Sequence, residues 1–515
     1  NKITILWVDD EIDLLKPHIL FLEKKNYKVT KCSSGTEAID IIEDTNFDIV
    51  FLDENMPGLT GLETLNEIKE KQDNLPVVMI TKSEEEYIME EAIGNKIADY
   101  LIKPVNPNQI LLSLKKNLDH SRLVSEKTTS NYQQEFRNIA MDLSGNLSRE
   151  EWTKMYQRLI DWELKLDSSD NDQLKGILDM QKKEANNEFS KFVIKNYKNW
   201  LDDPEGPVFS HNLFKKFLFP NLAKDKSNVL ILFDNLRYDQ WKIIEPILLE
   251  DFRVLNEETF YSILPTATQY SRNAIFAGMS PLEIQKHYEH IWLNDNEKGG
   301  KNQHEKELLG EQISNTLSEK IKWDYFKIRN INDSKTILEN IHNLLNNDLT
   351  VIVYNFIDML SHARTEMDVL KELASDEKAY RSLTRSWFLN SPIRAALQTL
   401  AEKDIRLFIT TDHGTIRVAQ PSRVLADRET STNLRYKVGK NLRFEDSDVL
   451  SIDDPHVIGL PRPNISSKFI FATGDKFFLY PNSYAHYNRM YSDTFQHGGI
   501  SLEEMICPFV ILDTK

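Results

Sequence analysis

The sequence is short of the features that would place it outside the cell or in a membrane. Among its 515 residues only Cys32 and Cys507 are cysteines, far apart in the chain, which argues against a disulfide framework or a cysteine metal site and favours a reducing compartment. No run of about 18 apolar residues occurs, as a membrane-spanning helix would need. The start, Asn1 to Asp9, enters a strand at once and lacks the parts of a signal peptide. We therefore expect a cytoplasmic protein with no membrane span.

Basic residues are also outnumbered. Lys and Arg total 63 and Asp and Glu total 80, which gives a formal net charge of −17. Duplex DNA is bound mainly through basic contacts to its phosphates, and no helix-turn-helix pattern with a basic recognition helix stands out after residue 120. We therefore expect no motif that binds duplex DNA, and a transcription factor of that kind is disfavoured.

One basic stretch departs from this acidic balance. Residues 435–443 contain no acid, and their basic residues are Arg435, Lys437, Lys440 and Arg443, with Tyr436 among them. Basic residues interleaved with an aromatic are typical of a groove that follows a nucleic-acid backbone. Two interpretations stay open: Arg435 and Lys437 contact a phosphate-containing substrate, or the stretch is a solvated loop.

The length suggests two to four domains, and the residue pattern changes near residues 120 and 225. Before residue 120, short apolar runs alternate with amphipathic stretches, which predicts a parallel sheet covered by helices on both faces. Ligands of such sheets lie at the carboxyl ends of the strands. The apolar runs are Ile3–Val8, Asp48–Leu52, Pro76–Ile80 and Tyr100–Ile102, and the helical stretches include Glu11–Lys25, Gly35–Asp44 and Gly61–Lys71.

Residues 121–225 have a different character, with few glycines and many Lys, Glu, Asn, Leu and Gln residues. Large apolar residues recur there at helical spacing; they are Trp152, Tyr156, Leu159 and Leu166. We predict a helical linker or bundle whose core these side chains form. A dimerisation or signal-coupling role is compatible with this composition but is not indicated by it.

The α/β alternation returns in residues 226–515. The predicted strands are Val229–Phe233, Leu349–Phe356, Arg406–Thr411 and Lys468–Tyr480, separated by long helical or irregular insertions. The polar stretch Asn294–Glu307 contains Gly299 and Gly300 and is expected to be a mobile loop. The expected fold class is α/β, with a doubly wound N-terminal domain, a central helical bundle and a second α/β domain.

Residues of complementary chemistry follow four of the apolar runs in the first domain. Asp9 and Asp10 follow the first run, Asp53 the second, Thr81 the third and Lys103 the fourth. Clustered carboxylates bind a hard cation such as Mg²⁺, and beside that cation Asp53 would be a nucleophile that forms an aspartyl phosphate. Lys103 would pair with the phosphoryl oxygens or the carboxylate, and Thr81 would hydrogen-bond the phosphate.

The stretches WVDDE, LDENMPGLTG, ITK and DYLIKP carry a resemblance to the receiver domain of response regulators at its five key positions. Residues 1–120 thus resemble this flavodoxin-like domain, which implies that Asp53 is the phosphoacceptor. The implied magnesium ligands are Asp10, Asp53 and the Asn55 carbonyl, with Asp9 assisting. The implied switch residues are Thr81, Tyr100 and Lys103, and Lys103–Pro104 would form a cis-proline bend.

Metal-binding residue types recur at strand ends and turns of residues 226–515. Asp358 and His362 lie four apart, so that on a helical turn they face the same side, as two ligands of one metal must. Mixed imidazole and carboxylate ligands suit Zn²⁺ but admit manganese as well. The remaining candidates are Asp234 and the pair Asp412–His413 after strands, and His497 in a glycine-rich turn.

Two threonines precede a helical pattern in residues 264–278, which Gly278 would close. A helix N-terminus suits a phosphate, and two cations about 4 Å apart can hold the attacking and leaving oxygens of an in-line displacement. A threonine hydroxyl beside such a cation loses its proton readily and becomes the nucleophile. Arg272 and Asn273 follow on the same helix and either contact the phosphate or form an ordinary surface pair.

The order of these motifs resembles the alkaline phosphatase superfamily, and LFDNLRYDQW at residues 232–241 resembles its PglZ branch. The resemblance covers residues 226–515 and implies two Zn²⁺ ions. One would be held by Asp358, His362 and His497, and the other by Asp234, Asp412, His413 and the nucleophile. PTAT is similar to the PTxT of the nucleotide pyrophosphatase/phosphodiesterase branch, which selects Thr268, with Thr266 as the alternative.

A receiver at 1–120, a helical linker at 121–225 and a PglZ-like domain at 226–515 together resemble the PorX-type response regulators. That resemblance implies control of type IX secretion, a sensor histidine kinase partner and a homodimer on phosphorylation. It also implies a zinc-dependent phosphodiesterase acting on linear or cyclic oligonucleotides, and a sigma factor as a further partner. Two other classes stay open: a non-catalytic, metal-bound adaptor that regulates transcription through protein partners, and a phosphomonoesterase or phosphomutase with the same metal ligands.

Overall fold

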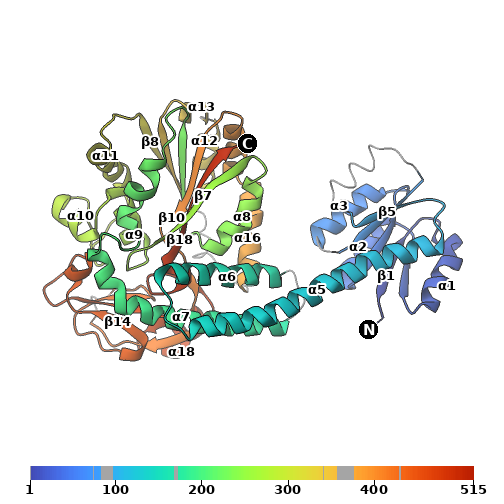
Figure 1. Ribbon diagram of the computed structural model, residues 1–515, viewed down its shortest axis with the longest axis horizontal. Helices are drawn as coiled ribbons and strands as arrows, with labels where there is room; N and C mark the ends of the chain where they lie inside the picture. The colour runs from blue at the N-terminus through green and yellow to red at the C-terminus, as the bar shows by residue number, and fades with distance from the viewer. Residues whose placement is uncertain are drawn as a thin grey trace. The chain divides into compact units, whose positions relative to one another are not determined.

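The computed structural model (Figure 1) describes residues 2–72, 75–82, 97–167, 172–339, 341–355, 376–427 and 431–515. The chain forms two compact units, residues 1–134 and residues 135–515. Two of the predicted metal ligands, Asp358 and His362, lie outside the described residues. Within those residues, no helix combines the length and the apolar composition needed to cross a membrane.

The first unit contains a five-stranded parallel sheet with the strand order β2-β1-β3-β4-β5. Its strands are β1 (Thr4–Val8), β2 (Lys28–Cys32), β3 (Ile49–Asp53), β4 (Val77–Thr81) and β5 (Asp99–Ile102). The described helices are η1 (Ile12–Leu15), α1 (Lys16–Lys24), α2 (Gly35–Asp44), α3 (Gly61–Lys71) and α5 (Pro107–Leu143). Helix α5 begins in the first unit and ends in the second.

Both faces of this sheet are buried, as the continuous apolar runs predict. Successive residues of a strand point to opposite faces, so that Leu6 and Val8 pack in one core with α2 and α3 residues. Ile5 and Trp7 pack in a second core, with Ile110 of α5 and residues of α1. The expected doubly wound receiver fold is confirmed.

Helices α6 (Arg149–Asp167) and α7 (Asp172–Asp202) open the second unit. The four large residues expected in a helical core are all buried. Trp152 contacts Phe189 and Phe192 of α7 through its ring, so the aromatic residues do pack one helix on the other. Short turns follow at η2 (Ser210–Asn212), η3 (Phe214–Leu218) and η4 (Phe219–Asn221).

A six-stranded sheet with the order β7-β18-β10-β6-β9-β8 forms the centre of the second unit. The neighbours β10, β6, β9 and β8 are parallel, and β18 and β7 extend the sheet antiparallel. Helix α9 lies on one side of this sheet, and α8 and α16 lie on the other (Figure 1). The strands are β6 (Asn228–Phe233), β7 (Phe252–Tyr261), β8 (Trp323–Ile328), β9 (Leu349–Tyr354), β10 (Arg406–Thr411) and β18 (Ile506–Thr514).

The other elements surround that sheet. The helices are α8 (Tyr238–Leu248), α9 (Thr268–Ala277), α10 (Pro281–His287), α11 (Glu305–Thr316), α12 (Ile331–Glu339), α13 (Ile341–Leu344), α16 (Glu377–Asn390), α17 (Pro392–Ala401), η5 (Asp446–Asp448), η6 (Pro455–Ile458), α18 (Tyr484–Tyr491) and α19 (Leu502–Met505). The minor strands are β11 (Ile416–Arg417), β12 (Gln420–Arg423), β13 (Tyr436–Gly439), β14 (Val449–Ile452), β15 (Lys468–Ala472), β16 (Lys476–Leu479) and β17 (Phe495–Gln496).

Two local predictions need correction. The single strand expected at Lys468–Tyr480 is two strands, β15 and β16, because Gly474 takes a positive φ of 55° and turns the chain between them. The stretch Asn294–Glu307 is not a loop throughout, because α11 begins at Glu305, whose side chain is only 1% exposed.

Candidate phosphoacceptor and metal sites

The carboxyl edge of the first sheet gathers the polar residues that the sequence singled out. Asp9 and Asp10 follow β1, Asp53 ends β3 and Thr81 ends β4. One carboxylate oxygen each from Asp9, Asp10 and Asp53 lies within 4.8 Å of the other two. Three carboxylates at that spacing form a donor set that a hard cation such as Mg²⁺ fits.

Lys103, which follows β5, joins the two buried acids of this cluster. Its Nζ donates to Asp9 Oδ2 at 2.9 Å and lies 3.0 Å from Asp53 Oδ1. Burial raises the pKa of the Asp53 carboxyl despite the opposing effect of the Lys103 ammonium. Asp53 is only 3% exposed, and the Lys103 ammonium places a positive charge beside it.

The other predicted receiver residues occupy different environments. Thr81 donates its hydroxyl hydrogen bond to Glu54, which follows Asp53 in the sequence and was not among the predicted site residues. Tyr100 is 41% exposed, and Asn55 is exposed as well. The Lys103–Pro104 peptide bond is cis, as expected.

The carboxyl edge of the second sheet holds a second cluster. Asp234 follows β6, and Asp412 and His413 follow its neighbour β10. All three side chains are buried, and one ligand atom from each lies within 4.8 Å of the others. Two carboxylates and an imidazole at this distance are a donor set that Zn²⁺ fits.

Backbone groups fix the orientation of the Asp412–His413 pair. The amides of Asn235 and His413 donate to Asp412 Oδ1 at 3.1 Å and 3.0 Å. His413 Nδ1 lies 3.1 Å from the carbonyl oxygen of Gly414. Since a carbonyl only accepts, Nδ1 carries the proton and the lone pair of Nε2 faces the site.

Thr268 is the first residue of α9 and lies beside this cluster. Its Oγ1 is 3.0 Å from His413 Nε2 and 3.4 Å from Asp234 Oδ1. Gly278 closes α9 in the left-handed conformation, as expected. The hydroxyl therefore lies at a helix N-terminus, where the backbone also favours an anion.

Thr266, the alternative nucleophile, has another role in the structure. It is fully buried, donates to the Gly499 carbonyl at 2.9 Å and accepts from the Gly498 amide at 3.0 Å. Its hydroxyl thus holds the turn that carries His497, which favours Thr268 as the residue available to a substrate.

His497 lies next to His413. The two rings stack with centroids 4.3 Å apart, and His497 Nδ1 lies 3.1 Å from the carbonyl oxygen of Thr266. As for His413, this contact puts the proton on Nδ1 and leaves Nε2 as the ligand atom. The structure thus brings together five of the seven predicted zinc ligands: Asp234, Thr268, Asp412, His413 and His497.

Arg272, expected either at the phosphate or on the surface, is buried among acids, so the surface alternative is wrong. Its Nη1 donates to Asp234 Oδ2 at 2.6 Å, and its Nε lies 2.8 Å from Glu305 Oε1. Asn273 is buried too and donates to the carbonyls of Gln269 and Lys301. Arg272 thus ties α9 to Asp234 and Glu305, and Asn273 ties it to Lys301. Glu305 was missed because it fell in a predicted loop.

The basic stretch 435–443 is neither a solvated loop throughout nor an open groove. Arg435 is fully buried and donates to Glu504 at 3.1 Å and 2.6 Å. Lys437 is 1% exposed and donates to the Ser431 carbonyl at 3.1 Å. Because both side chains are buried in the protein, neither is available to a nucleic-acid backbone.

A receiver edge with a buried, lysine-paired aspartate and an α/β domain with metal-type ligands together define a response regulator carrying an alkaline-phosphatase-like domain. Comparison with protein families agrees. Residues 5–115 match the response regulator receiver domain, residues 122–201 the PorX response regulator linker domain, and residues 213–512 the BREX system PglZ alkaline phosphatase-like domain. The chain belongs to the PglZ alkaline phosphatase-like family and has the domain order of a PorX-type response regulator.

Individual relatives match a smaller part of the chain. The transcriptional regulatory protein ResD of Bacillus subtilis is 34% identical over 115 residues, which are 22% of this chain and 48% of ResD. The transcriptional regulatory protein ZraR of Klebsiella oxytoca is 32% identical over 129 residues, 25% of this chain and 29% of ZraR. The chain therefore spans about half the length of ResD and less than a third of the length of ZraR. Among solved structures, the receiver domain of NtrX from Brucella abortus is 31% identical, with a TM-score of 0.22, and covers 22% of this chain and 98% of that one.

Proposed function

We propose that this response regulator is phosphorylated at Asp53 and that phosphorylation controls a zinc-dependent phosphodiesterase in its C-terminal domain. The observation that carries the enzymatic part is the place of Thr268. Its hydroxyl lies at a helix N-terminus, 3.0 Å from His413 Nε2 and 3.4 Å from Asp234. A hydroxyl in that position among buried metal-type ligands is suited to attack a phosphorus atom.

The residues would divide the metal ligation as follows. Asp234, Asp412, His413 and Thr268 would hold one Zn²⁺, and His497 would hold the other with Asp358 and His362. When bound, the two cations supply positive charge to the phosphoryl oxygens and lower the pKa of the attacking hydroxyl. Arg272 balances the negative charge of Asp234 by donating to its Oδ2, whereas the Thr268 hydroxyl contacts Oδ1.

The reaction then proceeds at Thr268. Its oxygen attacks phosphorus while the bond from phosphorus to the leaving alcohol oxygen breaks, and the alcohol departs with a proton. Water next attacks the phosphothreonine, releases the phosphate ester and restores the threonine hydroxyl. The N-terminal amides of α9 favour the phosphate throughout, because a helix N-terminus carries partial positive charge.

Control begins in the receiver. A sensor histidine kinase would supply the phosphoryl group, and Mg²⁺ held by Asp9, Asp10, Asp53 and the Asn55 carbonyl would neutralise it. Thr81 would leave Glu54 for the phosphoryl oxygens, Tyr100 would follow, and the changed surface would favour a homodimer. On the family likeness we further propose a cytoplasmic location, a role in type IX secretion, linear or cyclic oligonucleotides as substrates and a sigma factor as partner.

The test compares hydrolysis of a generic phosphodiester and the matching monoester by wild type and Thr268→Ala at equal zinc content. We expect wild type to prefer the diester and Thr268→Ala to lose activity by ~10³-fold or more, as for loss of a nucleophile. Thr266→Ser is the matched control, because it keeps the hydroxyl that holds Gly498 and Gly499, and it should stay active. A preference for the monoester would favour the phosphomonoesterase alternative, and equal inertness of wild type and Thr268→Ala would favour the metal-bound adaptor.

A further inference from the structure

Helix α7 of the linker is hydrogen-bonded to the segment that follows His497. The side-chain Nδ2 of Asn186 donates to Glu503 Oε2 at 2.9 Å, and its Oδ1 accepts from the backbone amide of Leu502 at 2.8 Å. One turn further on, the Ser190 hydroxyl lies 3.4 Å from the Ile500 carbonyl and accepts from the Gly474 amide at 3.3 Å. Asn186, Ser190 and Glu503 are all buried, so water does not compete for these bonds.

The same segment holds both histidines of the candidate metal site. Glu504 accepts from the Gly499 amide at 2.9 Å, and its carbonyl accepts from the Gly414 amide at 3.2 Å. Gly499 is two residues from His497, and Gly414 is next to His413. A shift of residues 500–504 would therefore move both imidazoles, although neither histidine touches α7 through these bonds.

Five residues before Asn186, α7 is hydrogen-bonded to the helix that leaves the receiver. Gln181 is 3% exposed and donates to the Phe136 carbonyl of α5 at 2.9 Å. On α6, Arg158 donates to Glu135 and Asp142 of α5 at 2.8 Å and 2.7 Å. Gln181 and Asn186 are five residues apart on one helix, so a displacement at the first reaches the second within about 8 Å of helix.

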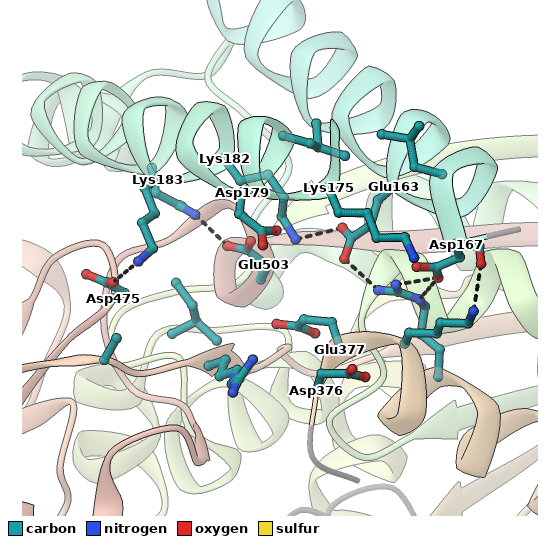
Figure 2. A pocket seen from close by; sticks show the side chains of 18 of the residues that line it. Glu163, Asp167, Lys175, Asp179, Lys182, Lys183, Asp376, Glu377, Asp475 and Glu503 are labelled. Atoms are coloured by element: carbon teal, nitrogen blue, oxygen red, sulfur yellow. Dashed lines mark hydrogen bonds and ion pairs between the residues drawn. The ribbon is translucent and has the colours of Figure 1, made fainter. Parts of the chain in front are cut away.

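A charged cavity lies between parts of α6 and α7 and residues of α16 and of the segment before β18, and Asn186 is part of its lining. It has a volume of about 360 Å³, and its lining includes Glu163, Lys182 and Glu503 (Figure 2). Lys182 donates to Glu163 at 2.6 Å, and Arg381 of α16 donates to Glu163 at 2.8 Å. Since the cavity borders Asn186 and provides few packing atoms there, the hydrogen bonds of Asn186 and Ser190 hold α7 to residues 500–503.

We propose that Asn186 is a positioning residue for His497 and His413, and that α7 thereby couples the receiver helix α5 to the metal site. This inference rests on the proposed function and adds its route of regulation. Asn186 acts through Glu503 and Leu502 and contacts no substrate. Gln181 links α5 to the same helix through its hydrogen bond to the Phe136 carbonyl.

The first experiment uses Asn186→Asp in the full chain, which places two carboxylates together and breaks the bond to Glu503. The affinity for Co²⁺, followed through its absorption spectrum, should fall ~10–100-fold, the usual effect of losing a residue behind a metal ligand. The kcat for a phosphodiester should fall with KM nearly unchanged. The swapped pair Asn186→Asp with Glu503→Gln restores the bond with its polarity reversed and should recover most of both quantities.

The second experiment tests the coupling. Gln181→Leu should keep basal hydrolysis and Co²⁺ affinity, but the ratio of activities with and without beryllofluoride, a phosphoryl mimic, should move to about one. Lys191→Gln, on the exposed face of α7, is the matched control and should keep the wild-type ratio.

Unchanged Co²⁺ affinity in Asn186→Asp, or a swapped pair as weak as the single variant, would overturn the positioning role. A wild-type ratio in Gln181→Leu, or a ratio of one in wild type itself, would overturn the coupling. Wild type without phosphodiesterase activity would instead refute the proposed function, and the Co²⁺ titration would still decide whether Asn186 positions the site.

Discussion

The residues around Lys103 and around Lys437 give these two lysines different charge states. Lys103 is 16% exposed and lies at 2.9 Å and 3.0 Å from two carboxylates, so it stays charged and ready for a phosphoryl group. Lys437 forms no ion pair with any carboxylate among the described residues, and its ammonium lies 4.5 Å from the centre of the Tyr480 ring. Burial lowers the pKa of Lys437 to about 7.

That lowered pKa makes a prediction about stability. Between about pH 7 and pH 10.5 the unfolded chain holds the Lys437 proton and the folded chain does not, so the free energy of unfolding rises with pH there. Lys437→Met should remove this slope and stabilise the second unit at pH 7 by ~2–4 kcal/mol, because one unit of pKa corresponds to about 1.4 kcal/mol. Denaturant unfolding at pH 7 and pH 9 measures both effects.

The control for that prediction is Lys440→Met, since Lys440 is exposed in the same stretch and should change neither value. If Lys437 instead contacted substrate, its replacement would raise KM for the phosphodiester and leave stability alone. The measurement therefore separates the buried role from the substrate role that the sequence suggested.

Residue types at strand ends could be found from the sequence, but their neighbours could not. Asp234 and the Asp412–His413 pair were identifiable because parallel strands end at one edge of a sheet, and the structure brings them within 4.8 Å. Arg272 follows Thr268 by four residues, so its place on the same side of α9 was readable. The contacts of Arg272 with Asp234 and Glu305 could not be predicted, because Glu305 comes from another element.

At the scale of elements, the turn after β10 packs directly on the segment before β18. A Cβ added to Gly414 would lie 2.1 Å from the Glu503 carbonyl oxygen, a distance that real atoms do not tolerate. Because both partners are backbone, relief requires the turn bearing Asp412 and His413 to move. Glycine at position 414 thus allows the close approach on which both histidines depend.

Gly414→Ala should therefore destabilise the second unit by ~1–3 kcal/mol, as overpacking does, and lower Co²⁺ affinity at the same time. Gly176→Ala is the matched control, since a Cβ there meets nothing within 4 Å on helix α7. It should stabilise the protein by ~0.5–1 kcal/mol and leave the metal site intact. Equal metal affinity in the two variants would contradict the role given to Gly414.

Helices and strands could be predicted where a single hydrophobic spacing ran through the whole segment. The eight residues of β1 and β3 that alternate between two cores follow from continuous apolar runs, and the α6–α7 pair follows from helical spacing of its aromatics. The split of Lys468–Tyr480 was missed because both halves are apolar and only Gly474 marks the turn. The burial of Arg435, just before β13, was missed because its partner Glu504 lies 69 residues away in the sequence.

At the scale of the whole molecule, the chain carries two chemical sites on two separate sheets. The sequence predicts domain boundaries near residues 120 and 225; the compact units divide at residue 134, so that α6 and α7 lie in the same unit as the second sheet. Composition marks where helices begin, but it does not reveal which domain they pack on. Those packing partners include Tyr238 of α8, which meets Tyr156 of α6 ring to ring.

Because the two sites lie on separate sheets, we expect that phosphoryl uptake and diester hydrolysis can be abolished independently. Asp53→Asn should abolish phosphoryl uptake from acetyl phosphate, because it removes the nucleophile, while zinc content and basal phosphodiester hydrolysis stay at wild-type values. Beryllofluoride should shift wild type to the elution volume of a dimer in gel filtration and change its hydrolysis rate, and it should do neither to Asp53→Asn. Thr268→Ala supplies the reciprocal control, since it should still take up phosphate and dimerise without hydrolysing the diester. Identical monomer elution of wild type with and without beryllofluoride would rule out the dimer step, and a rate change that persists in Asp53→Asn would show that the mimic acts elsewhere than at the receiver edge.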